Sequence, residues 1–209
     1  MRGLLITFEG VEGSGKSSQC RLLAERLRKE GRLVRETSEP DGTKLGETIR
    51  SLFEDRESRP APMTELFLFL AARQQHVTEV IRPALEAGEI VLSDRYADAT
   101  LAYQGYGRGL DRHTIRELNA LATGGIGPDL TILLDLDPAV GLERIGHRML
   151  DHFEQLDLAF HRRVREGYLE IAREEKERVV VLNGALPQAA IHEAIRRVVT
   201  ERLAVRGKP

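Results

Sequence analysis

The chain has 209 residues, a length that fits one domain, and its 41% hydrophobic and 31% charged residues suit a folded core with a polar surface. A net charge of −2 without a basic block argues against nucleic acid as a standing partner, and no apolar stretch is long enough for a signal peptide or a membrane span. The single cysteine, Cys20, excludes an internal disulfide and fits a reducing compartment. We therefore expect a cytoplasmic protein with one domain, residues 1–209, and no membrane partner.

Short apolar runs alternate with helical patterns along the whole chain. Runs rich in Val, Ile and Leu are typical of strands that are buried on both faces of a sheet. Strands are predicted at residues 4–8, 32–37, 90–93, 130–136 and 179–182. Helices are predicted at residues 17–30, 44–54, 63–87, 97–104, 112–122, 138–147, 153–176 and 187–204, with surface connections at 55–62 and 105–111. This alternation predicts an α/β fold with about five parallel strands and helices on both faces.

The first predicted strand leads directly into GVEGSGKS, residues 10–17, which fits the phosphate-binding pattern GxxxxGK[ST]. Glycines let successive backbone N–H groups turn toward a phosphate, and the helix that follows adds the partial positive charge of its N-terminus. Lys16 supplies a mobile positive charge, and Ser17 offers a hydroxyl to Mg²⁺. The segment predicts a site for ATP with Mg²⁺. Its expected members are Gly10, Val11, Glu12, Gly13, Ser14, Gly15, Lys16, Ser17 and Ser18.

Two later features help to choose among the protein classes that share such a loop. The Asn-Lys-x-Asp segment that specifies guanine is absent, which argues against a GTPase. Asp94, a second candidate Mg²⁺ ligand, ends a predicted strand and is followed by Arg95 rather than by a carboxylate that would activate water. An arginine at the carboxyl end of a parallel strand suits a second phosphate. The pattern therefore favours a kinase with a nucleotide acceptor over a regulatory or DNA-partitioning ATPase.

Several segments, in this order, resemble the bacterial thymidylate kinases, which are P-loop nucleoside monophosphate kinases. The segments are FEGVEGSGKSSQ, EPDGT, LFLFLAARQQH, SDRYADATLAYQGYGRGL, PDLTILLDL, and LDHFEQ followed by REGYL. The resemblance runs over nearly the whole chain. It implies a P-loop kinase fold with a short lid, transfer of the ATP γ-phosphoryl group to thymidine monophosphate (dTMP), and a homodimer. A kinase for another nucleoside monophosphate and a P-loop regulatory ATPase stay open as alternatives.

The candidate acceptor residues concentrate in two predicted helices. Phe69 and Arg73 are four residues apart, so a ring that stacks on a base and a guanidinium that binds its carbonyl edge share one helix face. The pattern alone equally allows a core phenylalanine and a solvated arginine. The resemblance implies that both contact thymine, that Thr100 and Gln104 also contact the base, and that Tyr103 crowds a ribose 2′-hydroxyl. A local backbone hydrogen bond is the alternative role for Thr100. The full expected acceptor set is Glu12, Arg50, Phe69, Arg73, Arg95, Thr100, Tyr103 and Gln104.

Glu12 places a carboxylate inside a loop that is built to bind anions. The resemblance implies that it accepts a hydrogen bond from the 3′-hydroxyl of the acceptor sugar, while a water of the Mg²⁺ shell is the alternative partner. Some relatives carry an arginine beside this acid, where this chain has Gly13. The lid, about residues 144–154, is therefore expected to supply Arg144 and Arg148 to the transition state, unless these are surface arginines. The expected catalytic residues are Lys16, Arg95, Arg144 and Arg148.

The chain departs from its relatives in two of these segments. Relatives usually read Arg-Glu-Pro-Gly-Gly-Thr where this chain has SEPDGT, residues 38–43, and Asp-Arg-x-Glu where it has DHFE, residues 151–154. Ser38 and Asp41 are expected to weaken binding of the acceptor phosphate. His152 replaces a lid arginine, and an imidazole with a pKa of about 6.5 is mostly neutral above that pH. We expect His152 and its neighbour His147 to be solvated.

Overall fold

A single sheet forms the centre of the computed structural model, which describes residues 2–55, 60–146 and 152–206. The five strands are β1 (Leu4–Glu9), β2 (Val34–Ser38), β3 (Ile90–Asp94), β4 (Leu130–Asp135) and β5 (Val179–Asn183). They lie in the order β2-β3-β1-β4-β5, and each neighbouring pair is parallel. The predicted sheet of five parallel strands is confirmed.

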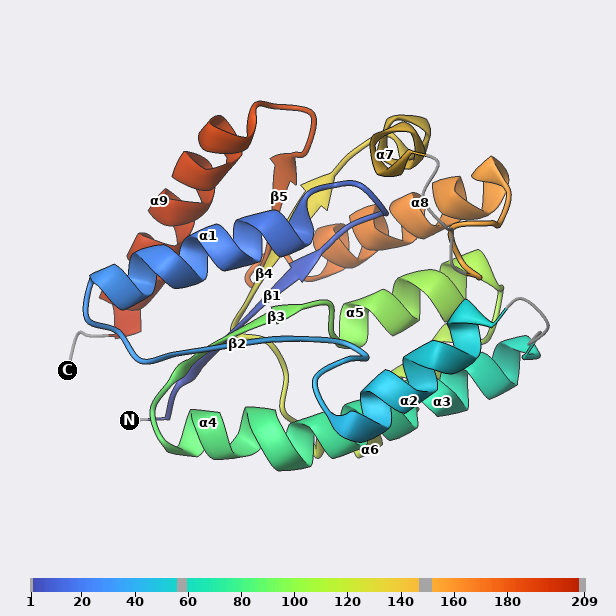
Figure 1. Ribbon diagram of the computed structural model, residues 1–209, viewed down its shortest axis with the longest axis horizontal. Helices are drawn as coiled ribbons and strands as arrows, with labels where there is room; N and C mark the ends of the chain where they lie inside the picture. The colour runs from blue at the N-terminus through green and yellow to red at the C-terminus, as the bar shows by residue number, and fades with distance from the viewer. Residues whose placement is uncertain (1, 56–59, 147–151, 207–209) are drawn as a thin grey trace.

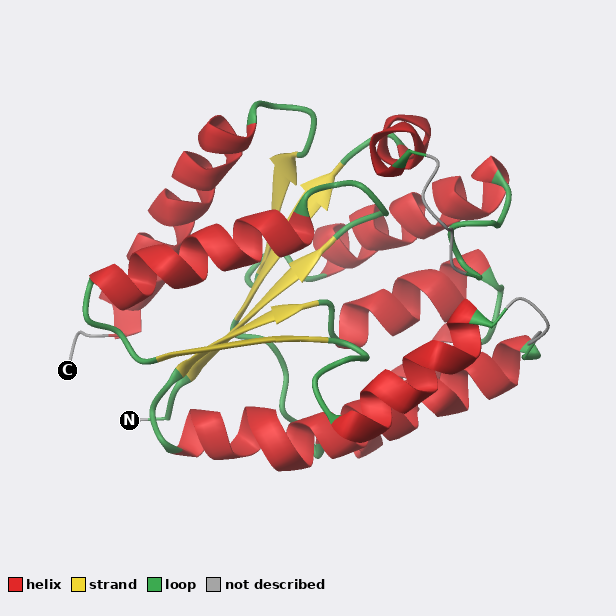
Figure 2. Cartoon of the chain, in the orientation of Figure 1, coloured by secondary structure: helices red, strands yellow, loops and turns green. Residues whose placement is uncertain are grey.

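Helices cover both faces of this sheet (Figures 1 and 2). The α-helices are α1 (Lys16–Lys29), α2 (Lys44–Glu54), α3 (Pro62–His76), α4 (Arg82–Glu86), α5 (Ala97–Thr100), α6 (Arg112–Thr123), α7 (Pro138–Ile145), α8 (Leu158–Glu174) and α9 (Gln188–Arg206). Two wider helical stretches, η1 (Val77–Ile81) and η2 (Leu101–Gly107), continue α3 and α5. None of the helices in these described ranges is long and apolar enough to cross a membrane.

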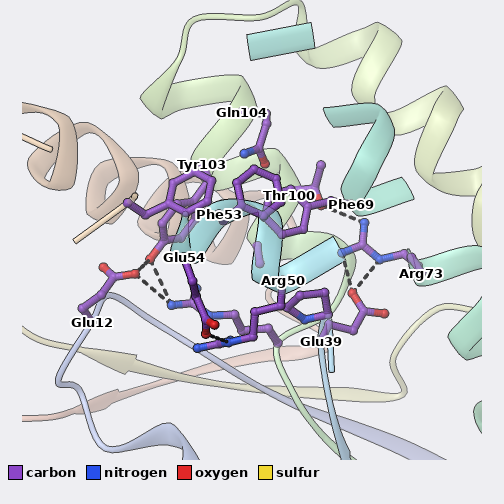
Figure 3. A pocket seen from close by; sticks show the side chains of 14 residues that line it. Glu12, Glu39, Arg50, Phe53, Glu54, Phe69, Arg73, Thr100, Tyr103 and Gln104 are labelled. Carbon is purple, nitrogen blue, oxygen red and sulfur yellow. Dashed lines mark hydrogen bonds and ion pairs between the residues drawn. The ribbon is translucent and has the colours of Figure 1, made fainter. Parts of the chain in front are cut away.

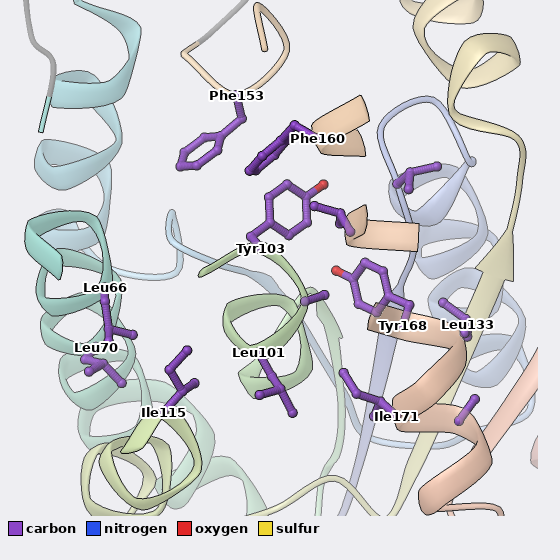
Figure 4. Packing of buried hydrophobic residues seen from close by; sticks show 14 of the residues in the cluster. Leu66, Leu70, Leu101, Tyr103, Ile115, Leu133, Phe153, Phe160, Tyr168 and Ile171 are labelled. Carbon is purple, nitrogen blue, oxygen red and sulfur yellow. The ribbon is translucent and has the colours of Figure 1, made fainter. Parts of the chain in front are cut away.

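The alternation of side chains along β1 explains the two layers. All six residues of β1 are buried, and neighbouring side chains point to opposite faces of the sheet. Leu4, Ile6 and Phe8 belong to the cluster that includes the buried faces of α1 and α9. Leu5 packs instead with η1 and α4 on the other face. A third cluster, beneath α3, α6 and α8, forms the floor of the acceptor side of the molecule (Figure 4).

Most helix boundaries lie close to the predicted ones, with two instructive differences. The helix predicted at residues 153–176 begins only at Leu158, because Asp157 accepts a hydrogen bond from Phe160 N and so caps the helix there. Residues 152–156 are turns, and the predicted start is wrong by five residues. The connection predicted at 105–111 is helical through Gly107, since η2 continues without a break from α5.

Glu9, at the end of β1, ties three parts of the fold together. It is fully buried, its Oε1 accepts from the Tyr96 backbone N–H at 2.8 Å, and its Oε2 accepts from the Tyr168 hydroxyl at 2.8 Å. Burial, together with the nearby Asp98 carboxylate, raises the pKa of Glu9 from 4.5 to about 8. The folded protein therefore holds a proton on Glu9 at neutral pH, whereas the unfolded chain does not.

This shift predicts a pH dependence of stability. Between the unfolded pKa of 4.5 and the folded pKa of about 8, only the folded state keeps the proton, so the contribution of Glu9 to the free energy of unfolding decreases as pH rises. The slope from one such group is about 1.4 kcal/mol per pH unit. Glu9→Gln keeps a carbonyl for the Tyr96 N–H and should remove this slope. Urea denaturation of both proteins between about pH 5 and pH 8 checks it; parallel curves would contradict the assignment.

Candidate active site

The phosphate-binding loop lies between β1 and α1, as predicted. Gly10, Gly13 and Gly15 all have positive φ, which a residue with a side chain adopts only under strain. The Nζ of Lys16 donates to the carbonyls of Gly10 at 2.9 Å and Val11 at 2.8 Å, so the side chain is folded over the loop. Burial, aided by the charge of Arg95, lowers the pKa of Lys16 to about 8.

Close backbone contact with α7 explains why residue 13 is glycine. A Cβ on Gly13 would lie 2.1 Å from the carbonyl oxygen of Gly141, and a Cβ on Gly141 would lie 2.1 Å from the carbonyl oxygen of Glu12. The same helix brings Arg144 to the loop, where its Nη1 donates to the carbonyls of Gly184 at 3.0 Å and Gly13 at 3.4 Å. Arg144 thus lies beside the loop, while its catalytic role stays a prediction. Arg148 and His147 lie outside the described residues, as do residues 149–151 of the expected lid.

A hollow on the outer side of the loop was not predicted. Its lining joins the loop and Arg144 to the connection between β5 and α9. The lining residues are Gly13, Ser14, Gly15, Ser18, Gln19, Arg144, Gly184, Ala185, Leu186, Pro187, Gln188 and Ile191. Residues 184–188 carry no charge and no known motif, so nothing in the sequence marks them as part of a site.

The eight expected acceptor residues come together in one pocket on the other side of the loop (Figure 3). The pocket has an open volume of about 670 Å³, and α2, α3 and the segment α5–η2 form most of its walls. Six further side chains line it that sequence reasoning did not single out: Glu39, Pro40, Phe53, Glu54, Ala99 and Phe153. The grouping matches the expectation, while the role of each residue stays a prediction.

Arg73 is neither solvated nor free. It is 2% exposed, and all five of its N–H groups are donated. Nε and Nη2 donate to Glu39 Oε2 at 2.9 and 2.6 Å, Nη1 donates to Thr100 Oγ1 and Asn119 Oδ1 at 2.7 Å each, and Nη2 also donates to the Tyr96 carbonyl at 2.9 Å. A base carbonyl in this pocket must therefore share or replace one of these bonds. The solvated arginine that the pattern allowed is excluded.

Glu39 is the anchor of that arginine. Burial alone would raise the pKa of Glu39, but Arg73 and His76 lower it below its ordinary value. The imidazole of His76 is fully buried between Glu39 Oε1, 3.2 Å from Nδ1, and the Thr37 hydroxyl, 2.7 Å from Nε2. Glu39 lies within the EPDGT segment, but its partner could not be inferred because α3 is far away in the sequence.

A second buried carboxylate orients Gln104. Glu65 on α3 is fully buried and accepts from Arg108 at 2.6 and 3.1 Å and from Gln104 Nε2 at 3.4 Å. An amide that donates its nitrogen to a carboxylate leaves its oxygen as an acceptor for the pocket. His152 Nε2 lies 3.1 Å from Glu65 Oε1, with the side chain 10% exposed. The same Nε2 lies 2.9 Å from Arg108 Nη2. The expectation of a solvated His152 is wrong, because the imidazole lies against the buried Glu65–Arg108 ion pair.

Aromatic side chains form the apolar wall of the pocket. Phe69 lies parallel to Phe53, with ring centroids 4.8 Å apart and an interplanar angle of 2°. Phe153 contacts both rings at centroid distances of 5.5 and 5.7 Å. Phe69 is packed against the core cluster and also lines the pocket, so its two suggested roles, core and base platform, are compatible.

The carboxylate of Glu12 is held by cations and hydroxyls from outside the loop. Arg95 adopts a φ of 71°, and its Nη2 donates to Glu12 Oε1 at 3.0 Å and contacts the Tyr103 hydroxyl at 3.1 Å. The Tyr103 hydroxyl also donates to Glu12 Oε1. Burial would raise the pKa of Glu12, but His161, Arg95 and Lys16 hold it well below its ordinary range. Glu12 is therefore an ionised group whose charge is neutralised locally.

The acceptor pocket and the loop meet at a second, more polar hollow. Its lining includes Lys16, Ser17 and Asp94, together with Ser38, Asp41 and Arg50. The Ser17 hydroxyl donates to Asp94 Oδ2 at 2.5 Å, and the buried Asp94 Oδ1 has no hydrogen-bond partner among the described residues. The Ser17 hydroxyl and the Asp94 carboxylate, whose Oδ1 has no partner there, are suitable ligands for a Mg²⁺ ion, which prefers oxygen ligands of this kind.

Arg50 does not offer a free charge to this hollow. Its Nη1 donates to Asp41 Oδ2 at 3.2 Å and its Nε to Glu54 Oε1 at 3.1 Å. Ser38 carries no positive charge, and the other cations that line this hollow are Lys16, Arg28 and Arg95. The weak binding of the acceptor phosphate stays a prediction.

A phosphate-binding loop at the carboxyl edge of a parallel sheet, facing a second pocket of nucleotide size, defines a P-loop nucleotide kinase. Comparisons with known proteins specify it further. The profile of the family described as Thymidylate kinase matches residues 8–195. The chain belongs to the thymidylate kinase family.

Individual relatives agree with this assignment. The thymidylate kinase of Deinococcus radiodurans is 50% identical over 202 residues, which cover 96% of this chain and 98% of that protein. The thymidylate kinase of Thermomicrobium roseum is 52% identical over 198 residues and 94% of each chain. The crystal structure of thymidylate kinase from Ehrlichia chaffeensis superposes with a TM-score of 0.79 at 34% identity, covering 95% of this chain and 99% of that one.

Because Arg73 is paired with a buried carboxylate, its replacement should lower the stability of the fold. Arg73→Ala leaves the buried carboxylate of Glu39 without its main partner, and breaking a buried ion pair from one side costs about 3–5 kcal/mol. We expect a loss of that size in the free energy of unfolding from urea denaturation. Arg50→Ala is the matched control, because its ion pairs are 35–56% exposed and should contribute about 1 kcal/mol or less. Equal stability of the two variants would show that Arg73 is not a structural anchor.

Proposed function

We propose that the protein transfers the γ-phosphoryl group of ATP to dTMP and forms dTDP. The observation that carries the proposal is the acceptor pocket itself: eight residues from the loop, α2, α3, the turn after β3, α5 and η2 line one pocket. The chain is an enzyme of the thymidylate kinase family, and the donor, base, sugar and phosphate contacts below are assigned on this geometry.

On the donor side, the loop holds the ATP phosphates with backbone N–H groups and the N-terminus of α1. Phosphoryl transfer has a loose transition state, so catalysis is positioning and neutralisation of charge. Lys16 must leave its two carbonyl partners to follow the transferring group, while Arg144 is already beside the loop. Ser17 and Asp94 would hold Mg²⁺, which would offset the negative charge of the phosphates when bound. We assign the outer hollow at residues 184–188 to the donor base.

On the acceptor side, the pocket is complementary to a base with an N3–H group. Phe69 supplies a platform for stacking, and the Arg73–Thr100 pair faces the carbonyl edge. Because Gln104 donates its nitrogen to Glu65, its oxygen can accept from N3–H of thymine. Cytosine has an unprotonated N3 and would leave two acceptors facing each other, which a buried site rejects strongly. This is the basis for preferring dTMP over dCMP.

The polar hollow accounts for the remaining contacts. Glu12 accepts from the sugar 3′-hydroxyl, and Arg95, with Lys16 across the hollow, faces the acceptor phosphate. Tyr103 contacts both Glu12 and Arg95, so it fixes the position of the two charged groups that flank the sugar. The ring of Tyr103 fills the space near the sugar edge, which favours a deoxyribose.

We also propose a homodimer that forms through α2, α3 and α6. These helices pack side by side, and they carry exposed apolar side chains that a second copy would cover: Leu45, Leu52, Met63, Phe67 and Leu121. Phe67 is 56% and Leu121 79% exposed. Exposed apolar groups gathered on neighbouring helices are typical of an interaction surface. The cytoplasmic location, the single domain and the extent of the lid stay predictions from the sequence.

A panel of acceptors tests the function directly. With ATP and Mg²⁺ we expect dTMP to be the best acceptor, dUMP to follow because it keeps the N3–H, and dCMP to be poorer by about two orders of magnitude or more.

Lys16→Met should lower the turnover with dTMP by about 10²–10³-fold at unchanged stability. A variant within tenfold of the original turnover would refute the role of the loop. ATP hydrolysis without any acceptor transfer would favour a regulatory ATPase instead.

The weak phosphate grip gives a second test. Asp41→Asn removes a negative charge from the lining of the hollow and leaves Arg50 paired with Glu54 only, so the half-saturating dTMP concentration should fall about threefold or more. Ser38→Arg should lower it further by adding a cation. Glu54→Gln is the control, because Glu54 also pairs with Arg50 but is 56% exposed. Steady-state kinetics with dTMP and ATP varied separately decide the matter: unchanged dTMP saturation in Asp41→Asn and Ser38→Arg would mean that the remaining cations suffice.

A further inference from the structure

A histidine that the sequence analysis did not single out lies against Glu12. His161, in the first turns of α8, is 1% exposed, and its Nδ1 lies 3.3 Å from Glu12 Oε2. The two groups are not aligned for a hydrogen bond. Within the described part of the chain, neither ring nitrogen of His161 nor Glu12 Oε2 has any other hydrogen-bond partner. Two buried, unpaired polar groups thus face each other beside the acceptor pocket.

A buried polar atom without a hydrogen-bond partner lowers the stability of the fold, so two such atoms 3.3 Å apart suggest a hydrogen bond between them. A buried donor or acceptor without a partner costs about 1–3 kcal/mol, and a charged one costs more. Oε1 of Glu12 is already occupied by Tyr103 and Arg95. Oε2 is the oxygen left for a further donor, and His161 Nδ1 is the donor within reach. A small rotation of either side chain would complete the bond.

The orientation of this carboxylate matters for the reaction. Donors on Oε1 alone hold one oxygen, whereas Oε2 can still move through small combined rotations about the Cβ–Cγ and Cγ–Cδ bonds of Glu12. A donor on Oε2 from α8 removes that freedom, and helix packing holds the imidazole itself: Phe160 and Val164, its neighbours on α8, are buried in the core cluster. We propose that His161 is a positioning residue, which donates from Nδ1 to Glu12 Oε2 and holds the carboxylate in the orientation that receives the acceptor sugar. The proposal rests on the proposed function of Glu12.

Substitutions at position 161 separate this role from a structural one. His161→Leu removes the donor, and we expect the half-saturating dTMP concentration to rise about tenfold while that of ATP is unchanged. His161→Asn places an amide nitrogen near the Nδ1 position and should restore most of the affinity. Val164→Ala is the matched control, because it removes buried volume from the same helix and should lower the melting temperature without a selective effect on dTMP.

A double-mutant cycle tests whether the effect passes through Glu12. If it does, His161→Leu should change the dTMP dependence much less in a Glu12→Gln background than in the original protein. An equal effect in both backgrounds would overturn the proposal. So would a loss in His161→Leu that is shared by ATP, or a folded His161→Asn that restores nothing.

A measurement that does not depend on turnover tests the positioning role of His161 separately from the proposed kinase function. Imidazole ¹⁵N spectra of the free protein should show a proton on Nδ1 of His161, with a resonance that moves in Glu12→Gln. A bare Nδ1 would overturn the positioning role even if the enzyme phosphorylates dTMP. If the protein phosphorylates no nucleoside monophosphate, the proposed function fails, and the spectra still report whether His161 donates to Glu12.

Discussion

The parallel pairing of β1 with β3 is the constraint on which the site depends. The register sets Phe8 opposite Asp94, and beyond the last pair the Arg95 N–H donates to the Phe8 carbonyl at 3.0 Å. The phosphate-binding loop and the Asp94–Arg95 pair therefore leave the sheet side by side. A slip of one residue would turn the Asp94 side chain to the other face of the sheet, away from the Ser17 hydroxyl that donates to it. The loop and Arg95 therefore line one polar hollow at the ends of these two strands.

Buried ion pairs give the acceptor pocket its shape. Arg73, Arg95 and Arg108 each meet a buried carboxylate, which is Glu39, Glu12 and Glu65 respectively. Such pairs add little net stability, since desolvation offsets much of their attraction. Their benefit is that hydrogen-bonding groups are oriented before the substrate arrives, so less reorganisation is needed during the reaction. The pocket is preorganised by charges that rarely face solvent.

The sequence predicted those parts of the site that rest on local spacing. The glycines of the loop, the helix-face pair Phe69–Arg73 and the strand-end Arg95 all follow from patterns within one element, and the resemblance to a family supplied the rest of the acceptor set. The partners of these residues could not be predicted in the same way. Glu39, Glu65 and His161 act across elements that are 34 to 149 residues from the side chains they hold, counted between Glu39 and Arg73 and between Glu12 and His161.

The wrong prediction for His152 also arises from a contact between elements that are far apart in the sequence. His152 was predicted to be solvated, yet its imidazole lies against the buried Glu65 carboxylate of α3 and the Arg108 guanidinium. The late start of α8 is a local effect that was missed, since Asp157 competes with the apolar pattern that precedes it. A contact with a buried ion pair determines the position of His152, and a helix cap determines the start of α8. Hydrophobic periodicity determines neither.

The contact between Gly13 and Gly141 restricts how this sequence can change. Each position excludes a side chain because the backbone of the other element occupies the space a Cβ would need. A side chain at position 13 is therefore incompatible with the present packing of α7, and it would require a shift of α7 and of Arg144, which α7 carries. Positions 13 and 141 can change only together with the packing between the loop and this helix.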